Sequence, residues 1–134
     1  WGHDMSPKEN QYQAGIQFTI SYKKNIDFVG KESLLKIKDK KNNKKFVMLV
    51  LQDSKPGEPL LLHDEPIYKD KEIIGRTTSG NYSFNYNKNL AFGYINIDLP
   101  LEDLLKENLF IEVEKKKYPA SIILKPLNNK NIRN

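Results

Sequence analysis

Residues 46–51 read Phe46-Val47-Met48-Leu49-Val50-Leu51, a continuous apolar run with the length of a β-strand. A short run without polar interruptions is typical of a strand that is buried in a sheet. The loop signals Pro56-Gly57 and Pro59 follow it and end the regular structure. This run therefore predicts that the core of a β-sheet begins near the middle of the chain.

The second half of the chain continues with further segments of strand character, separated by turn signals. A short helix is expected at 101–106, and tight turns are expected at Asp70-Lys71 and Lys116-Lys117. Because no long helix is available to connect parallel strands, the pattern predicts a mostly β (α+β) fold, an antiparallel barrel or sandwich. The expected strands cover residues 66–69, 73–78, 90–96, 109–114 and 118–124.

The first forty residues have a different pattern of apolar and polar residues. Ile16, Phe18 and Ile20 alternate with polar residues, which predicts a strand with one apolar face. Residues 33–38 have the spacing of a short amphipathic helix, and the Asn-rich and Lys-rich run 39–43 is expected to end it. One or two short helices are therefore expected in the whole fold.

Length and composition exclude several classes of protein. A chain of 134 residues with 38% hydrophobic and 29% charged residues corresponds to one globular domain. It has no cysteine, which removes disulfides and thiolate metal sites, and no apolar window approaches the roughly eighteen residues of a membrane span. The net charge of +5 is concentrated in the lysine runs 36–45 and 115–117, which we interpret as solvated connections, with an anion-binding surface as the alternative.

Candidate chemistry is sparse. His3 and His63 lack the context of a zinc site, and no glycine-rich phosphate loop is present. Ser79 has no accompanying nucleophile motif, and Gly80 is expected to supply a positive φ in a turn. The aromatic residues within 82–86 predict one face of a hairpin, although base stacking on a barrel is an alternative. On these grounds the chain is a binding or assembly module without a complete active site.

Several stretches, in order, carry a family resemblance. They are Trp1-Gly2-His3-Asp4-Met5, Gln13-Ala14-Gly15-Ile16, Asp27-Phe28-Val29-Gly30-Lys31-Glu32-Ser33-Leu34, Gly75-Arg76-Thr77-Thr78-Ser79-Gly80-Asn81-Tyr82-Ser83, Asn89-Leu90-Ala91-Phe92-Gly93-Tyr94-Ile95 and Tyr118-Pro119-Ala120. Together they resemble the C-terminal part of the glycine cleavage T-protein (aminomethyltransferase) family. Two motifs, Glu65-Pro66-Ile67-Tyr68 and Thr77-Thr78-Ser79-Gly80, are more similar to the dimethylglycine and sarcosine dehydrogenase branch of this family than to the free-standing T-protein.

The resemblance implies an antiparallel β-barrel of about six strands and three parts of the chain. Residues 1–25 would be a lead-in segment and strand from a preceding folate-binding domain, 26–127 the C-terminal barrel, and 128–134 a flexible tail. The first residue is Trp1 and not Met, which suggests a piece of a longer chain. The resemblance further implies upstream domains of the same polypeptide as partners, FAD bound by the parent chain but not by this segment, and a cytoplasmic or mitochondrial matrix location.

The implied chemistry is the capture by tetrahydrofolate of a one-carbon unit from an oxidised N-methyl amine, or from an aminomethyl carrier in the T-protein. The resemblance places Trp1 and Phe18 as rings of the folate cavity and Gln13 at its polar edge, where the family has Glu. A neutral amide can form hydrogen bonds there but cannot pair as an anion. No catalytic or metal-ligating residue is assigned to this chain, whose parent would be the enzyme. A basic barrel that binds nucleic acid remains the alternative from another class.

Overall fold

The computed structural model describes residues 1–24 and 26–124. Six strands form a closed barrel in the order β1-β4-β3-β2-β5-β6, and every neighbouring pair is antiparallel. This confirms the predicted fold class and shows a barrel where the residue pattern also allowed a sandwich. The strands are β1 (Lys44–Leu51), β2 (Pro66–Lys69), β3 (Glu72–Ser83), β4 (Lys88–Asn96), β5 (Leu109–Val113) and β6 (Lys116–Ile123).

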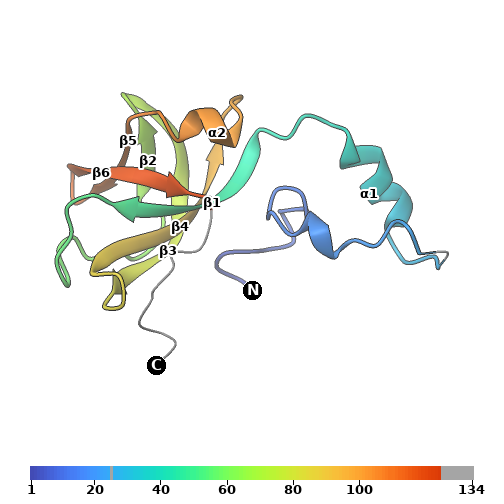
Figure 1. Ribbon diagram of the computed structural model, residues 1–134, viewed down its shortest axis with the longest axis horizontal. Helices are drawn as coiled ribbons and strands as arrows, with labels where there is room; N and C mark the ends of the chain where they lie inside the picture. Colours follow the sequence, from blue (N-terminus) through green and yellow to red (C-terminus); the bar gives the residue numbers. More distant parts are fainter. Residues whose placement is uncertain (25, 125–134) are drawn as a thin grey trace.

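Two short α-helices and one turn of 3-10 helix lie outside the barrel wall. They are α1 (Lys31–Lys38), α2 (Leu101–Leu104) and η1 (Gln17–Thr19). Figure 1 shows α2 against one end of the barrel. Helix α1 stands apart from the barrel: the barrel occupies one end of the molecule's long axis and α1 the other. The segment that precedes α1 lies between the two, so the first forty residues extend to one side of the barrel.

Alternation along the strands builds the core. In β1, Val47, Leu49 and Leu51 are buried, whereas the residues between them are partly exposed. Such alternation is what a barrel requires, because every second side chain points inward. Leu104 of α2 is 1% exposed and joins the same core. The buried cluster consists of Val47, Leu49, Leu51, Leu61, Ile67, Ile74, Ala91, Ile95, Leu104, Leu109, Ile111, Ala120 and Ile122.

The predicted strand around Ile16–Ile20 is wrong. Residues 17–19 form η1, in which the Ile20 amide donates to the Gln17 carbonyl at 3.1 Å and the Thr19 hydroxyl donates to the Ile16 carbonyl at 2.7 Å. A strand needs a neighbouring strand for its backbone groups, and within residues 1–24 and 26–124 no strand pairs with this segment. The alternation of apolar residues was therefore not a sufficient sign of a strand.

Two turns differ from expectation. The β5–β6 turn lies at Glu114 and Lys115 and not at Lys116-Lys117. Glu114 and Lys115 adopt the positive φ values, 51° and 65°, that a two-residue hairpin turn needs. The predicted turn at Gly80 is wrong as well. Gly80 pairs with Ala91 inside the sheet, and a Cβ there would lie 2.6 Å from Cβ of Leu61, so the glycine permits close packing.

Two other expectations are confirmed, and a third is met only in part. The turn at Asp70 joins β2 to β3, and the helix expected at 33–38 ends at Lys38. The aromatic face expected over residues 82–86 extends only partly, since β3 ends at Ser83 and Phe84 is 76% exposed in the following turn. The tail expected at 128–134 lies outside the described residues.

Candidate functional site

The residues that the resemblance assigns to folate all lie on the segment before α1. The side chains of Trp1 and Phe18 are 85% and 82% exposed, whereas Gln13 is half-buried. Both rings are therefore open to contact with another molecule or domain. Large aromatic side chains usually bury their apolar area, so their exposure marks this segment as a surface for interaction.

Gln13 is held in place by the backbone around it. Its side-chain Oε1 accepts a hydrogen bond from the Asn10 amide at 3.0 Å, while Oδ1 of Asn10 accepts from the amides of Tyr12 and Gln13. The Gln13 carbonyl also accepts from the amide of Phe46 in β1 at 2.9 Å. Within the described part of the chain, its Nε2 donor has no partner. This donor is thus available to a ligand.

A small cavity adjoins Gln13. It has a volume of about 180 Å³ and is lined by Tyr12, Gln13, Lys40 and Lys41, among others. Burial, and the hydroxyl of Tyr22 at 2.6 Å, raise the pKa of the Tyr12 hydroxyl to about 12. The surroundings therefore combine a neutral phenol, an amide and two cations, which suit an anionic or hydrogen-bonding ligand.

Besides the backbone hydrogen bond between Phe46 and Gln13, two side-chain contacts join this segment to the barrel wall. Oδ1 of Asp4 accepts hydrogen bonds from the hydroxyls of Thr78 at 2.6 Å and Ser79 at 2.8 Å, both in β3. Beside them, the rings of His3 and His63 lie 6.4 Å apart. The two family-like stretches around Asp4 and Thr78 are therefore in direct contact although 74 residues separate them.

The second contact centres on Lys44, the first residue of β1. Its ammonium lies 2.6 Å from Glu9 and 4.7 Å from the centre of the Tyr94 ring. The hydrogen bond from Lys44, followed by that from Ser6, holds the pKa of Glu9 below its usual value. Burial, reinforced by Glu9 and Asp4, raises the pKa of Tyr94 to about 12.

Lysines of the run 36–45 are partly engaged within the fold. Lys41 forms an ion pair with Asp98 at 2.5 Å, and Lys45 donates to the Ile97 carbonyl at 2.9 Å. Burial lowers the pKa of Lys45. Together with the Lys44–Glu9 pair, these contacts give part of the run a structural role that the interpretation as solvated connections did not anticipate.

A groove with both polar and apolar lining lies between residues 19–21 and the start of α1. It has a volume of about 470 Å³ and includes Ile20, Ile26, Phe28, Val29 and Leu34. Ile26 is 69% exposed and Val29 is fully exposed. Uncovered aliphatic side chains in one groove are unusual for a free surface and indicate contact with another apolar surface.

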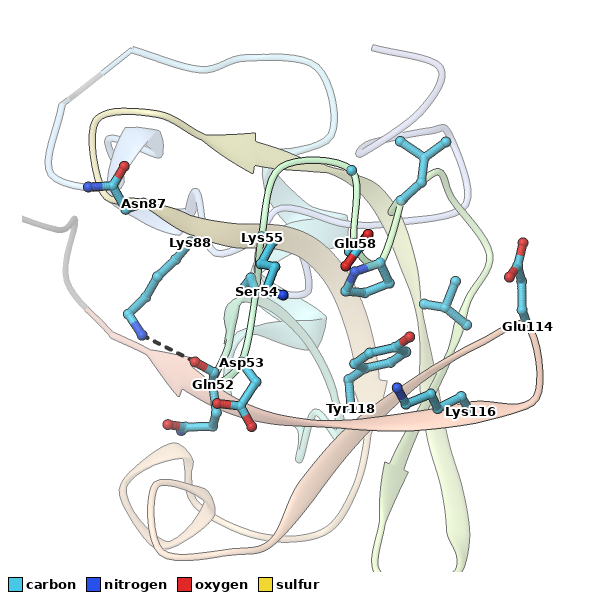
Figure 2. A pocket seen from close by; sticks show the side chains of 14 residues that line it. Gln52, Asp53, Ser54, Lys55, Glu58, Asn87, Lys88, Glu114, Lys116 and Tyr118 are labelled. Atoms are coloured by element: carbon cyan, nitrogen blue, oxygen red, sulfur yellow. Dashed lines mark hydrogen bonds between the residues drawn. The ribbon is translucent and has the colours of Figure 1, made fainter.

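A larger cavity of about 710 Å³ opens at one end of the barrel, between the loop after β1, the β3–β4 turn and the β5–β6 hairpin. Figure 2 shows Tyr118 across its floor with Lys116 beside it, while Ser54, Lys55 and Glu58 come from the opposite loop. Lysines and carboxylates both line it, and the three residues assigned to folate are not among its lining. Sequence reasoning identified the loop at Pro56-Gly57 and Pro59 but not the cavity, because the three loops meet only in the folded barrel.

Across 1–24 and 26–124, no group of three or more His, Cys, Asp or Glu side chains could hold a metal ion. The helices of this part of the chain are too short and too polar to cross a membrane. The N-terminal segment thus exposes two aromatic rings and holds one amide beside two lysines, groups that can contact a ligand.

Comparison with known proteins agrees with this arrangement. The glycine cleavage T-protein C-terminal barrel domain family matches residues 44–128. Dimethylglycine dehydrogenase from Rattus norvegicus, a mitochondrial protein, is 35% identical over 129 residues, and a 4-methylaminobutanoate oxidase (formaldehyde-forming) from Paenarthrobacter nicotinovorans is 30% identical over 125 residues. These alignments cover 95% and 93% of this chain but 14% of each relative, so the chain spans about one seventh of their length.

Two further comparisons concern the aminomethyltransferase branch. Aminomethyltransferase from Synechococcus elongatus is 27% identical over 94% of this chain, which is 32% of the relative. The crystal structure of aminomethyltransferase T from Bartonella henselae superposes with a TM-score of 0.76 at 20% identity, over 93% of this chain and 34% of that one. The higher identity to the dehydrogenase confirms the predicted branch, and none of these relatives bears the name of a nucleic-acid-binding protein, so the nucleic-acid alternative gains no support. The chain belongs to the glycine cleavage T-protein C-terminal barrel family.

Proposed function

We propose that this chain is the C-terminal, folate-side domain of a dimethylglycine or sarcosine dehydrogenase-like enzyme. In that role it helps to enclose tetrahydrofolate, which accepts a one-carbon unit from an oxidised N-methyl amine. The observation that carries the proposal is the segment 1–20, which is fastened to the barrel at Asp4 and Gln13 while it presents the Trp1 and Phe18 rings uncovered.

The chemistry of this segment fits folate. The pteridine is flat and has a hydrogen-bonding edge, which calls for aromatic contact and for an amide or carboxylate. Trp1 and Phe18 would supply ring contact, and the partly buried Gln13 would donate from Nε2 to that edge. Lys40, beside Gln13, would attract the anionic glutamate tail. When bound, the folate supplies the acceptor for the one-carbon unit.

The rest of the pocket would come from upstream domains of the same polypeptide. The open groove around Ile26 and Val29 supports this, because those side chains would be covered by such a domain. FAD would bind farther upstream, and the small-molecule N-methyl amine would be oxidised there. The rat relative is named as mitochondrial, which supports a mitochondrial matrix location for a eukaryotic parent and a cytoplasmic one otherwise.

A binding measurement tests this proposal. The longer polypeptide, comprising the transferase domains and this chain, is titrated with 5-formyltetrahydrofolate in a calorimeter. We expect one site per polypeptide and a loss of at least tenfold in affinity for Phe18→Ala. Phe84→Ala is the matched control, since Phe84 is similarly exposed at 76% but lies on the barrel turn. Equal effects of both substitutions would argue against the folate role of Phe18.

A second candidate is the C-terminal domain of a T-protein aminomethyltransferase, supported by the 94% coverage of this chain in the Synechococcus relative. Its one-carbon donor would be an aminomethyl carrier and not a free N-methyl amine. The two candidates are separated by substrate: dimethylglycine-dependent reduction of a dye by the longer polypeptide would identify the dehydrogenase, and activity with aminomethyl-lipoate would identify the transferase.

A further inference from the structure

We infer that Asp4 is a positioning residue, through which β3 of the barrel holds the folate-side segment in its binding geometry. This inference rests on the proposed function of Trp1, Gln13 and Phe18. It goes beyond that function because it assigns a role to one carboxylate and two barrel-wall hydroxyls that are not among the residues assigned to folate.

The contact is specific in its atoms. A single oxygen, Oδ1 of Asp4, accepts from both the Thr78 hydroxyl at 2.6 Å and the Ser79 hydroxyl at 2.8 Å. Two donors to one ionised oxygen form charge-assisted hydrogen bonds, which are stronger than neutral ones. Because the partners are adjacent residues of a strand inside a closed barrel, the carboxylate is fixed to a rigid element.

The geometry of the chain transmits this restraint to the proposed site. Asp4 is three residues from Trp1, and the Gly2 amide donates to the Met5 carbonyl at 2.8 Å, which closes a turn around Asp4. On the other side, the Gln13 carbonyl is fixed by the Phe46 amide at 2.9 Å. The backbone between Trp1 and Gln13 is therefore held at three points, Asp4, Glu9 and Gln13, and release of the first would free the residues that precede Glu9, Trp1 among them.

Hydrogen exchange tests the restraint without any ligand. In the 134-residue chain, we expect Asp4→Ala to accelerate exchange of the amides in segment 1–9 at least tenfold, with the barrel amides unchanged. Asp4→Asn keeps one acceptor oxygen and should restore part of the protection. The combined change Thr78→Val and Ser79→Ala removes both donors and should reproduce the Asp4→Ala effect without adding to it. Asp27→Asn is the control, because Asp27 is exposed and bonds only the amide of the next residue.

Folate binding by the longer polypeptide tests the positioning role. We expect Asp4→Ala to raise the Kd for 5-formyltetrahydrofolate about tenfold and Asp4→Asn to raise it less, whereas the control Asp27→Asn should leave the Kd unchanged. Unchanged exchange in Asp4→Ala would overturn the restraint, and faster exchange with unchanged Kd would overturn the positioning role. A wild-type polypeptide that binds no folate would overturn the proposed function and this role together, whereas the exchange result would still report on the restraint.

Discussion

The ammonium of Lys44 lies 2.6 Å from the carboxylate of Glu9, so the first residue of β1 forms an ion pair with the segment that precedes α1. The Glu9 side chain is 11% exposed and that of Lys44 is 34% exposed, so the pair is more shielded than a typical surface pair. Together with Asp4, it makes the N-terminal segment a part of the barrel's structure and not a free arm.

Glu9→Gln should destabilise the protein at neutral pH by about 1 kcal/mol. The pKa of Glu9 is lowered below its usual value of 4.5 in the folded protein. Its stabilisation is therefore fully present above pH 4.5 and is lost as the pH falls through the lowered pKa. Thermal unfolding of wild type and variant at pH 7 and at pH 3 measures this, and the difference should shrink at the lower pH.

Glu32→Gln serves as the control for that experiment. Glu32 is exposed in the first turn of α1, so Glu32→Gln should change the thermal stability little at either pH. A Glu9→Gln effect that persists at pH 3 would mean that packing, and not the ion pair, causes the loss.

Tyr94→Phe should leave stability unchanged or raise it. Among the described residues, the buried Tyr94 hydroxyl has no hydrogen-bond partner. Removing a buried, unsatisfied hydroxyl while keeping the ring costs little and can gain on the order of 1 kcal/mol. Urea unfolding at pH 7 measures the difference, and a loss above about 2 kcal/mol would show that the hydroxyl has a partner such as bound water.

The same residue predicts a dependence on alkaline pH. Because its pKa is raised to about 12, the contribution of Tyr94 is fully present below pH 10 and is lost as the pH rises toward 12. Tyr94→Phe should therefore show a smaller loss of stability over this range than wild type. Tyr12, whose pKa is also raised to about 12, should keep part of the slope in the variant.

Gly93→Ala should be severely destabilising, by about 3 kcal/mol. A Cβ at this position in β4 would lie 2.5 Å from the Arg76 carbonyl oxygen and 2.9 Å from Cδ1 of Ile67. The backbone of β3 would have to move to admit it. Chemical denaturation measures the loss, with Gly57→Asn as control, since Gly57 has a φ of 75° that Asn tolerates and open space around it.

Gln13→Glu should weaken folate binding about tenfold, because it removes the Nε2 donor that Gln13 is proposed to present to the pteridine edge. The substitution preserves the oxygen that accepts from the Asn10 amide, and Lys40 and Lys41 line the same cavity, so the fold should tolerate the charge. Calorimetric titration of the longer polypeptide with 5-formyltetrahydrofolate measures it. Stronger binding in the variant would show that Gln13 faces donors on the ligand, with which an ionised acceptor forms stronger hydrogen bonds than an amide does.

The barrel could be predicted from the sequence because local sequence signals mark its strands and turns. The continuous apolar run 46–51 and the tight turn at Asp70 are local signals that agree with the tertiary structure. The segment around Phe18 could not be predicted, since its alternating pattern had no strand to pair with. The turn at Glu114 and Lys115 was missed by two residues because neither side chain is typical of positive φ.

The candidate site, too, could be predicted from the sequence only in part. Trp1, Gln13 and Phe18 came from family resemblance, and the structure places all three on one segment without testing their role. The contact of Asp4 with Thr78 and Ser79 could not be read from spacing, because 74 residues separate Asp4 from Thr78 and only packing of the N-terminal segment against β3 brings them together. The cavity at Tyr118 has the same origin, in three loops distant along the chain.

The central claim is tested most directly by the fate of the one-carbon unit in a chimera. The homologous 129-residue part of rat dimethylglycine dehydrogenase is replaced by this chain, and free formaldehyde is measured during dimethylglycine oxidation with and without tetrahydrofolate. We expect unchanged dye reduction and a marked fall in formaldehyde when tetrahydrofolate is present. A chimera that oxidises dimethylglycine but releases the same formaldehyde with and without tetrahydrofolate would contradict the account.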